Sequence, residues 1–138
     1  MTESTKIEFR HRRVSEIGDI TDLVEMLFPG NRNQQHAAAR ILLALKMADG
    51  PLASLGSVGQ RYGISRRTLQ RTRAKLHRLG IIEHVSWMSS RYGGQHGWKL
   101  SGRMSTALRR LASWIGEWRK DRRPAKLGRE EVLIGLLR

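Results

Sequence analysis

The sequence predicts a mainly α-helical protein with one small β-hairpin. Apolar residues recur at spacings of three and four through most of the 138 residues, which is the period of an amphipathic helix. Only residues 81–87 are β-branched, aromatic and partly alternating in the manner of a strand. The length suits one domain with appended helices, and we divide the chain into residues 1–32, 33–101 and 102–138.

Residues 1–32 are expected to form a flexible arm followed by one helix. Ser15 is the candidate N-cap of this helix, because a hydroxyl at that position accepts a backbone N–H of the first turn. An apolar stripe runs from Ile17 to Phe28, so the helix is expected over residues 15–28. Pro29-Gly30 then ends it.

Two further helices are expected between residues 33 and 62. The longer one begins near Asn33 and ends before Asp-Gly-Pro at 49–51. Ser54 is the candidate cap of a short helix that ends at Gly63, a residue type with access to positive φ. Gly59 lies inside this short helix, where glycine costs about 1 kcal/mol, so the helix is expected to be short or irregular.

Residues 65–79 form the most informative segment. Ser65 is placed to cap a helix whose inner stripe faces a core, with Leu69, Thr72, Leu76 and Leu79. On a helical wheel the opposite side carries Arg67, Gln70, Arg71, Ala74 and Arg78. A small hydrophobic module that presents such a cationic helix has the shape required to enter the major groove of DNA.

The remaining elements are a hairpin and two helices. The hairpin comprises residues 82–100, with a polar tip at 89–97. A helix beginning near Ser101 carries an apolar face of Leu108, Leu111, Ile115 and Trp118. A basic linker is expected at residues 120–126, and a short last helix at 130–137.

The charge is concentrated in the middle of the chain. Of the net charge of +14, residues 54–99 contribute +8, from nine Lys or Arg and a single acid, Glu83. Such clustering indicates a polyanionic partner whose phosphates the protein neutralises. The alternative is a surface that only improves solubility.

Several classes of function are disfavoured by what the sequence lacks. It has no cysteine, which removes disulfide, thiolate and cysteine–zinc chemistry. The histidines show no metal-ligand spacing, phosphate-loop and dinucleotide fingerprints are absent, and acids are scarce where the chain is most basic. We therefore expect a cytoplasmic protein that is not an enzyme, with no metal, cofactor, membrane segment or small-molecule effector.

The order of two helices, an arginine-rich helix and a hairpin resembles a winged helix-turn-helix domain. Residues 37–100 are similar to regulators of the MarR, PadR and GntR kind, through Val58, Tyr62, Gly63, Ile64, Ser65, Thr68, Leu69, Arg71, Leu76, Leu79, Gly80, Ile81 and Ile82. The resemblance implies sequence-selective binding of double-stranded DNA by a homodimer that regulates transcription. Helix 65–79 would occupy the major groove, and the wing at 82–100 would contact the backbone or minor groove.

The candidate DNA-binding residues fall into three groups. Arg67, Gln70 and Arg71 are candidates for direct readout, since arginine can bond guanine and glutamine adenine through two hydrogen bonds. Phosphate contacts are expected near the helix start and along its flank, from Ser65, Arg66, Thr68, Lys75 and Arg78. The wing candidates are Arg91, Gln95, His96 and Lys99; the alternative for the wing is an ordinary flexible hairpin tip.

Tryptophans and flanking helices suggest packing surfaces. Trp87 and Trp98 are interpreted as the core of the wing base, with stacking on unpaired bases as the alternative. Residues 15–28 and 103–118 are candidate dimer interfaces; either helix could instead cover the core of its own chain.

Two other functions are compatible with these patterns. One is a replication or partition factor of a plasmid, phage or virus, which would use the same DNA-binding module. The other is a protein–protein adaptor, in which the cationic face of helix 65–79 would have no need of its charge.

Overall fold

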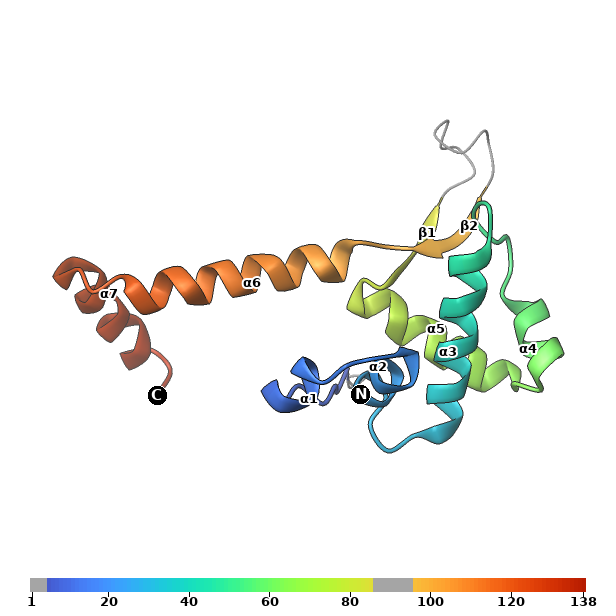
Figure 1. Cartoon of the computed structure of the whole chain (residues 1–138). Helices are drawn as coiled ribbons and strands as arrows, with labels where there is room; N and C mark the ends of the chain where they lie inside the picture. The colour runs from blue at the N-terminus through green and yellow to red at the C-terminus, as the bar shows by residue number, and fades with distance from the viewer. Residues whose placement is uncertain (1–4, 86–95) are drawn as a thin grey trace. The chain divides into compact units, whose positions relative to one another are not determined.

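The protein is described by a computed structural model covering residues 5–85 and 96–138. Trp87, Arg91 and Gln95, in the expected hairpin tip, lie outside the described residues. The described chain is mainly helical with one two-stranded antiparallel sheet, which confirms the predicted class (Figure 1). It divides into two compact units, Met1–Met104 and Ser105–Arg138.

The first unit contains five helices and the two strands. In chain order these are α1 (His11–Ser15), α2 (Ile20–Leu27), α3 (Arg32–Met47), α4 (Gly56–Tyr62), α5 (Arg66–Leu79), β1 (Ile82–Val85) and β2 (Gly97–Leu100).

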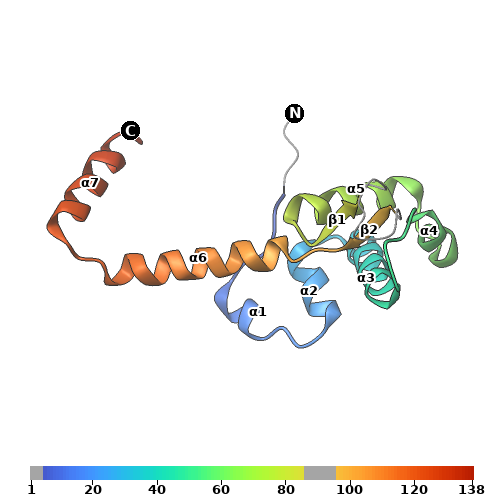
Figure 2. The same ribbon diagram turned by 90° about the horizontal axis from the view of Figure 1, so that it is seen from above.

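Helix α3 is the centre of this unit. It lies between α2 and α4 (Figure 2) and packs against α5 and β2. Its buried residues follow helical spacing: Ala37, Ala38, Ile41, Leu42 and Leu45. Phe28, Leu76 and Ile82 close the core around them with at most 1% of their surface exposed. Burying each large side chain of this kind is worth about 1.5–3 kcal/mol.

The prediction of one N-terminal helix over residues 15–28 is wrong. Helix α1 ends at Ser15, and α2 begins after Asp19, whose carboxylate accepts the backbone N–H groups of Thr21 and Asp22 at 2.8 and 3.2 Å. Asp19 is therefore the N-cap that Ser15 was expected to provide. Helix α2 turns its apolar face onto α3 and so covers the core of its own chain.

Local signals around α5 are confirmed. Gly63, at φ +66°, ends α4, and the Ser65 hydroxyl accepts the Thr68 N–H at 3.1 Å at the start of α5. At the other end Gly80 adopts φ +81°. The Gly80 and Ile81 N–H groups bond to His77 O and Leu76 O, each at 3.0 Å, which is the Schellman arrangement.

Gly59 has a packing role that explains a glycine inside a helix. A Cβ at this buried position would lie 3.2 Å from Ile64 O and 3.3 Å from Leu69 Cδ2. The absence of a side chain therefore lets α4 approach α5 closely, and this contact offsets the low helix propensity of glycine.

The hairpin is fastened to the chain before α4. Strands β1 and β2 pair in register from Ile82 opposite Leu100 to Val85 opposite Gly97. Leu52 adds an isolated bridge on the other side of β2: its N–H donates to Trp98 O at 2.9 Å, and Trp98 N–H donates to Leu52 O at 2.8 Å. The bridge gives the small sheet a third, single-residue pairing.

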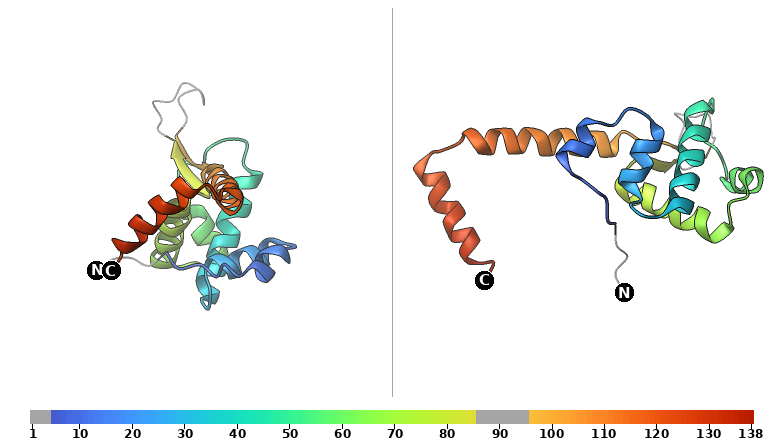
Figure 3. Two further views of the ribbon diagram at one scale, coloured as in Figure 1. Left: turned by 90° about the vertical axis from the view of Figure 1, so that its left-hand side faces the viewer. Right: turned by 60° about the horizontal axis from the view of Figure 1, so that its bottom comes forward.

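The second unit is built from α6 (Arg103–Lys120) and α7 (Pro124–Gly135). The expected linker at 120–126 and last helix at 130–137 are corrected, because α7 already begins at Pro124. Proline is favoured at the first helical position, where its missing N–H has no partner to lose. Figure 3 shows the two helices joined end to end, and neither contains a buried residue.

Replacing Gly97 with alanine should strongly destabilise the first unit. Gly97 has φ +141°, and an added Cβ would lie 2.1 Å from Leu52 O, so strain and a backbone clash coincide. We expect a loss of about 2 kcal/mol or more in the free energy of unfolding by denaturant titration. Gly102→Ala is the control, since nothing lies within 4 Å of its Cβ position; equal losses in both variants would contradict this account.

Replacing Thr72 with valine should stabilise the protein. Thr72 is fully buried at 0% exposure, and within residues 5–85 and 96–138 nothing hydrogen-bonds its hydroxyl. Valine keeps the shape and removes the unpaired polar group, so unfolding should cost about 1 kcal/mol more. Thr68→Val, which removes a partner of the Ser65 hydroxyl, should give no such gain; destabilisation by Thr72→Val would refute the assignment.

Candidate nucleic-acid interface

The outer face of α5 is an exposed cationic surface. Arg66, Arg67, Gln70 and Arg71 are all exposed, whereas Leu69, Thr72 and Leu76 on the inner face are buried. The helix contains no Asp or Glu, and within the parts of the chain that the structure describes no carboxylate pairs with these arginines. The face therefore presents guanidinium and amide donors to a partner from a rigid element.

The start of α5 adds further donors and a small hollow. Ser65 Oγ donates to Thr68 Oγ1 at 3.0 Å, and a pocket of about 200 Å³ is lined by Asn33, His36, Gly63, Ile64, Ser65 and Thr68. The first turn carries Arg66 and Arg67 where acids would be favoured by the helix dipole. An anion such as a phosphate would be stabilised at this end. Sequence reasoning missed Asn33 and His36, because they come from α3.

Lys75 does not belong to this surface, which corrects its prediction as a DNA contact. Only 9% of the residue is exposed. Its Nζ donates to Lys6 O at 2.6 Å and lies 4.6 Å from the Phe28 ring centroid. Burial, followed by the charge of Arg78, lowers the pKa of its ammonium. Lys75 therefore ties the N-terminal segment to α5.

The N-terminal segment also contacts Arg78. The Arg78 Nε donates to Thr5 Oγ1 at 3.2 Å, although the side chain is exposed. The Glu8 N–H donates to Met26 O at 2.9 Å. The expected arm is thus fixed against the first unit from Thr5 onward, beside the last turns of α5.

At the hairpin, only part of the predicted surface is available for a partner. His96 is exposed, and Arg91 and Gln95 lie outside the described residues. Lys99 is half-buried with its Nζ 3.1 Å from Glu83 Oε1, so its predicted DNA contact is corrected to an ion pair across the sheet. Glu83 Oε2 also lies 3.2 Å from Arg103 Nε and accepts the Ser101 hydroxyl at 3.3 Å.

Trp98 packs at the base of the hairpin. Its indole is half-buried against the core, and the Arg73 guanidinium lies 4.9 Å from its centroid. The rings of His77 and His84 meet it edge-on, with centroid distances of 5.6 and 4.9 Å. This arrangement agrees with the interpretation of Trp98 as core, and it occupies Arg73, which was expected to meet phosphates or solvent.

Other kinds of site find no support in the described part of the chain. Residues 5–85 and 96–138 contain no group of three or more side chains that could hold a metal ion. No helix in those ranges combines the length and apolar character needed to cross a bilayer. Comparison with protein-family models, curated proteins and solved structures finds no match to this chain.

Replacing Glu83 with glutamine should remove an acid-sensitive part of the stability. Burial raises the pKa of Glu83, but the bonds and charges of Lys99, Arg103 and Ser101 outweigh it, so the pKa falls below the ordinary value of 4.5. A lowered pKa stabilises the fold above pH 4.5 and loses that contribution as pH falls through the folded-state value. Glu83→Gln should thus be less stable than the natural protein at pH 7, and the gap should close on acidification.

The measurement is denaturant unfolding of both proteins at a series of pH values between 7 and about 3. Glu117→Gln on α6 is the control, since Glu117 makes no ion pair within the residues that the structure describes. A stability difference for Glu83→Gln that stays constant with pH would overturn the ion-pair account.

Proposed function

We propose that this protein binds double-stranded DNA sequence-selectively, with α5 in the major groove. The observation that carries the proposal is the exposed face of Arg67, Gln70 and Arg71, which lies opposite the buried stripe of the same helix. The major groove admits an α-helix, and these side chains are suited to reading guanine and adenine. Arg66 and the hydroxyls of Ser65 and Thr68 supply phosphate contacts that fix the register.

The order of elements supports a winged helix-turn-helix architecture for this unit. Helix α3 is followed by the Leu52 bridge, α4, the turn at Gly63, α5 and the antiparallel pair β1–β2. In such a domain the second and third helices form the helix-turn-helix and the hairpin forms the wing. His96 on the wing side is then available to phosphates or the minor groove.

The protein is further proposed to be a homodimer through α6 and α7. No residue of either helix is buried, although Leu108, Leu111, Ile115 and Trp118 are spaced in alternating steps of three and four, as in a helix-pairing seam. The exposed apolar side chains of the two helices amount to roughly 1,000 Å² per chain, more than the roughly 300–600 Å² patches of typical monomers.

A second copy is the occupant that this surface fits. Each partner of a standard interface buries about 800 Å², which the exposed apolar area of α6 and α7 can supply. A two-fold dimer would present two α5 helices and therefore read a palindromic site. Such a protein would regulate transcription where its sites overlap promoters; sites confined to a replication origin would favour the replication or partition role.

Arg71→Ala should relax sequence selectivity. Loss of a two-bond contact to one base is expected to cost about 1–3 kcal/mol at that base pair, with other positions unchanged. Arg66→Ala should instead weaken binding to all sequences alike and reduce the slope of log affinity against log salt by about one. Selection from a random duplex library, followed by titrations over a range of salt, measures both effects.

Lys46→Ala is the matched control, because Lys46 is an equally exposed cation on α3. It should leave the selected site unchanged. If Arg71→Ala and Arg66→Ala lower affinity equally for every sequence, base readout by Arg71 is wrong. If no duplex binds at low salt, the DNA-binding proposal fails and the adaptor function is favoured.

Leu111→Glu should convert the dimer to a monomer. Leu111 lies in the α6 seam and is 50% exposed, so a carboxylate there would be buried without a partner on association. Ser113→Glu, on the opposite side of α6, should leave the dimer intact. Sedimentation velocity measures both, and a natural protein that sediments as a monomer would exclude the self-association proposal.

A further inference from the structure

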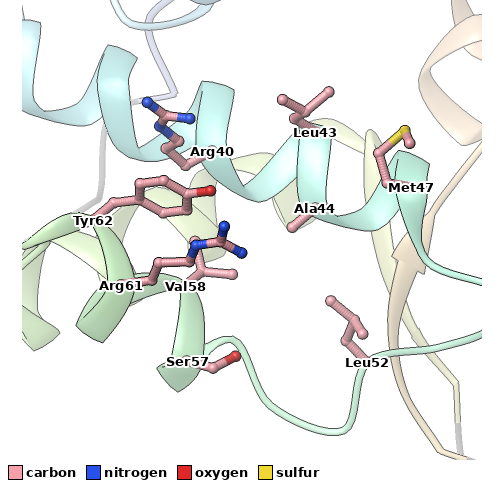
Figure 4. A pocket seen from close by; sticks show the side chains of 9 residues that line it. All are labelled: Arg40, Leu43, Ala44, Met47, Leu52, Ser57, Val58, Arg61 and Tyr62. Carbon is pink, nitrogen blue, oxygen red and sulfur yellow. The ribbon is translucent and has the colours of Figure 1, made fainter.

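A pocket between α3 and α4 is distinct from the outer face of α5. Its volume is about 380 Å³, and it is lined by Arg40, Leu43, Ala44, Met47, Leu52, Ser57, Val58, Arg61 and Tyr62 (Figure 4). Sites for small molecules occupy roughly 300–1,000 Å³, so the pocket is large enough for a compact ligand. On α4 these residues share one side, whereas Gly59, on another side, packs against α5.

One end of the pocket is cationic. The Arg40 guanidinium carbon lies 4.0 Å from the Tyr62 ring centroid, and that of Arg61 lies 5.4 Å from it. Figure 4 shows the Tyr62 ring between the two guanidinium groups. Stacking on an aromatic ring restrains a guanidinium while leaving its edge N–H groups directed outward, which is the geometry that binds carboxylates.

These guanidinium groups have no anionic partner in the protein. Arg40 Nε donates to His36 Nε2 at 3.4 Å. No acidic residue lines the pocket, and no carboxylate in residues 5–85 or 96–138 forms an ion pair with either arginine. Two adjacent unneutralised cations repel each other, and an anion between them would relieve that repulsion.

The other end of the pocket is apolar. Leu43 and Met47 follow Arg40 on α3 at helical spacing and are 46% and 72% exposed. Leu52 and Val58 form the facing wall. A phosphate of a nucleic acid would use the arginines but leave these side chains uncovered, whereas a small organic acid would use both ends.

We infer that this pocket binds a small amphipathic carboxylate, with its charge at Arg40 and Arg61 and its apolar body over Leu43, Met47 and Leu52. The sequence does not predict this site, since its two ends come from side chains on separate helices. The site does not depend on the proposed binding of DNA by α5.

The probe for the test is 2-naphthoate, titrated into ¹⁵N-labelled full-length protein and followed by amide chemical shifts. Saturable shifts are expected at α3 and α4. Arg40→Met and Arg61→Met keep much of the aliphatic stem and should each weaken binding about tenfold, by removing a charge-assisted bond. Met47→Ser should weaken it several-fold, and Arg110→Met on α6 should have no effect.

Two further ligands separate the contributions of charge and apolar body. Acetate, which lacks the body, and 2-naphthylmethylammonium, which reverses the charge, should both bind at least tenfold more weakly than 2-naphthoate. Equal binding of acetate would show a simple anion site and overturn the proposal, as would equal binding of the ammonium probe. Circular dichroism and thermal unfolding check that each variant is folded.

A short DNA duplex provides the last arm. If Arg40→Met weakens duplex binding as much as Arg71→Ala while 2-naphthoate does not bind, the pocket belongs to the nucleic-acid surface and the inference is wrong. Naphthoate binding that survives Arg71→Ala supports the inference even if α5 binds no DNA.

Discussion

The burial of one side of α5 against α3 is the constraint on which the candidate interface depends. A helix is rigid and repeats every 3.6 residues, so fixing Leu69 and Leu76 in the core also fixes which side chains point outward. The Gly63 turn and the Ser65 cap determine where the helix begins. Together they place Arg67 and Arg71 one turn apart on an exposed face, and no further contact is needed to orient that face.

Close approaches of the backbone hold the elements on either side of α5. At Gly59, α4 comes near enough to α5 that a methyl group would crowd Ile64 O and Leu69. At Gly97, β2 meets the Leu52 backbone with no room for a Cβ. One contact sets the spacing of the helix pair and the other ties the hairpin to the chain before α4. Both positions need glycine because of a neighbour distant along the chain.

The sequence predicts what depends on nearby residues and misses what depends on distant ones. Caps and turns at Gly63, Ser65 and Gly80 are local and were predicted. Asp19 and Ser15 are both suitable caps, and the choice between them follows from how α2 packs on α3. Lys75 lies at the edge of the inner stripe, and its partner, Lys6 O, is 69 residues away, so no local pattern reveals its burial.

The single acid between residues 54 and 99 separates structural cations from available ones. Glu83 neutralises Lys99 and Arg103 around the base of the hairpin. Within the described chain no carboxylate does the same for Arg66 or Arg71, which lie with other arginines near the positive end of the α5 dipole. This repulsion destabilises the free protein, and a bound polyanion would remove it. Because a ligand that relieves strain in the folded state also stabilises that state, the outer face of α5 is organised to gain most from a partner that carries closely spaced phosphates.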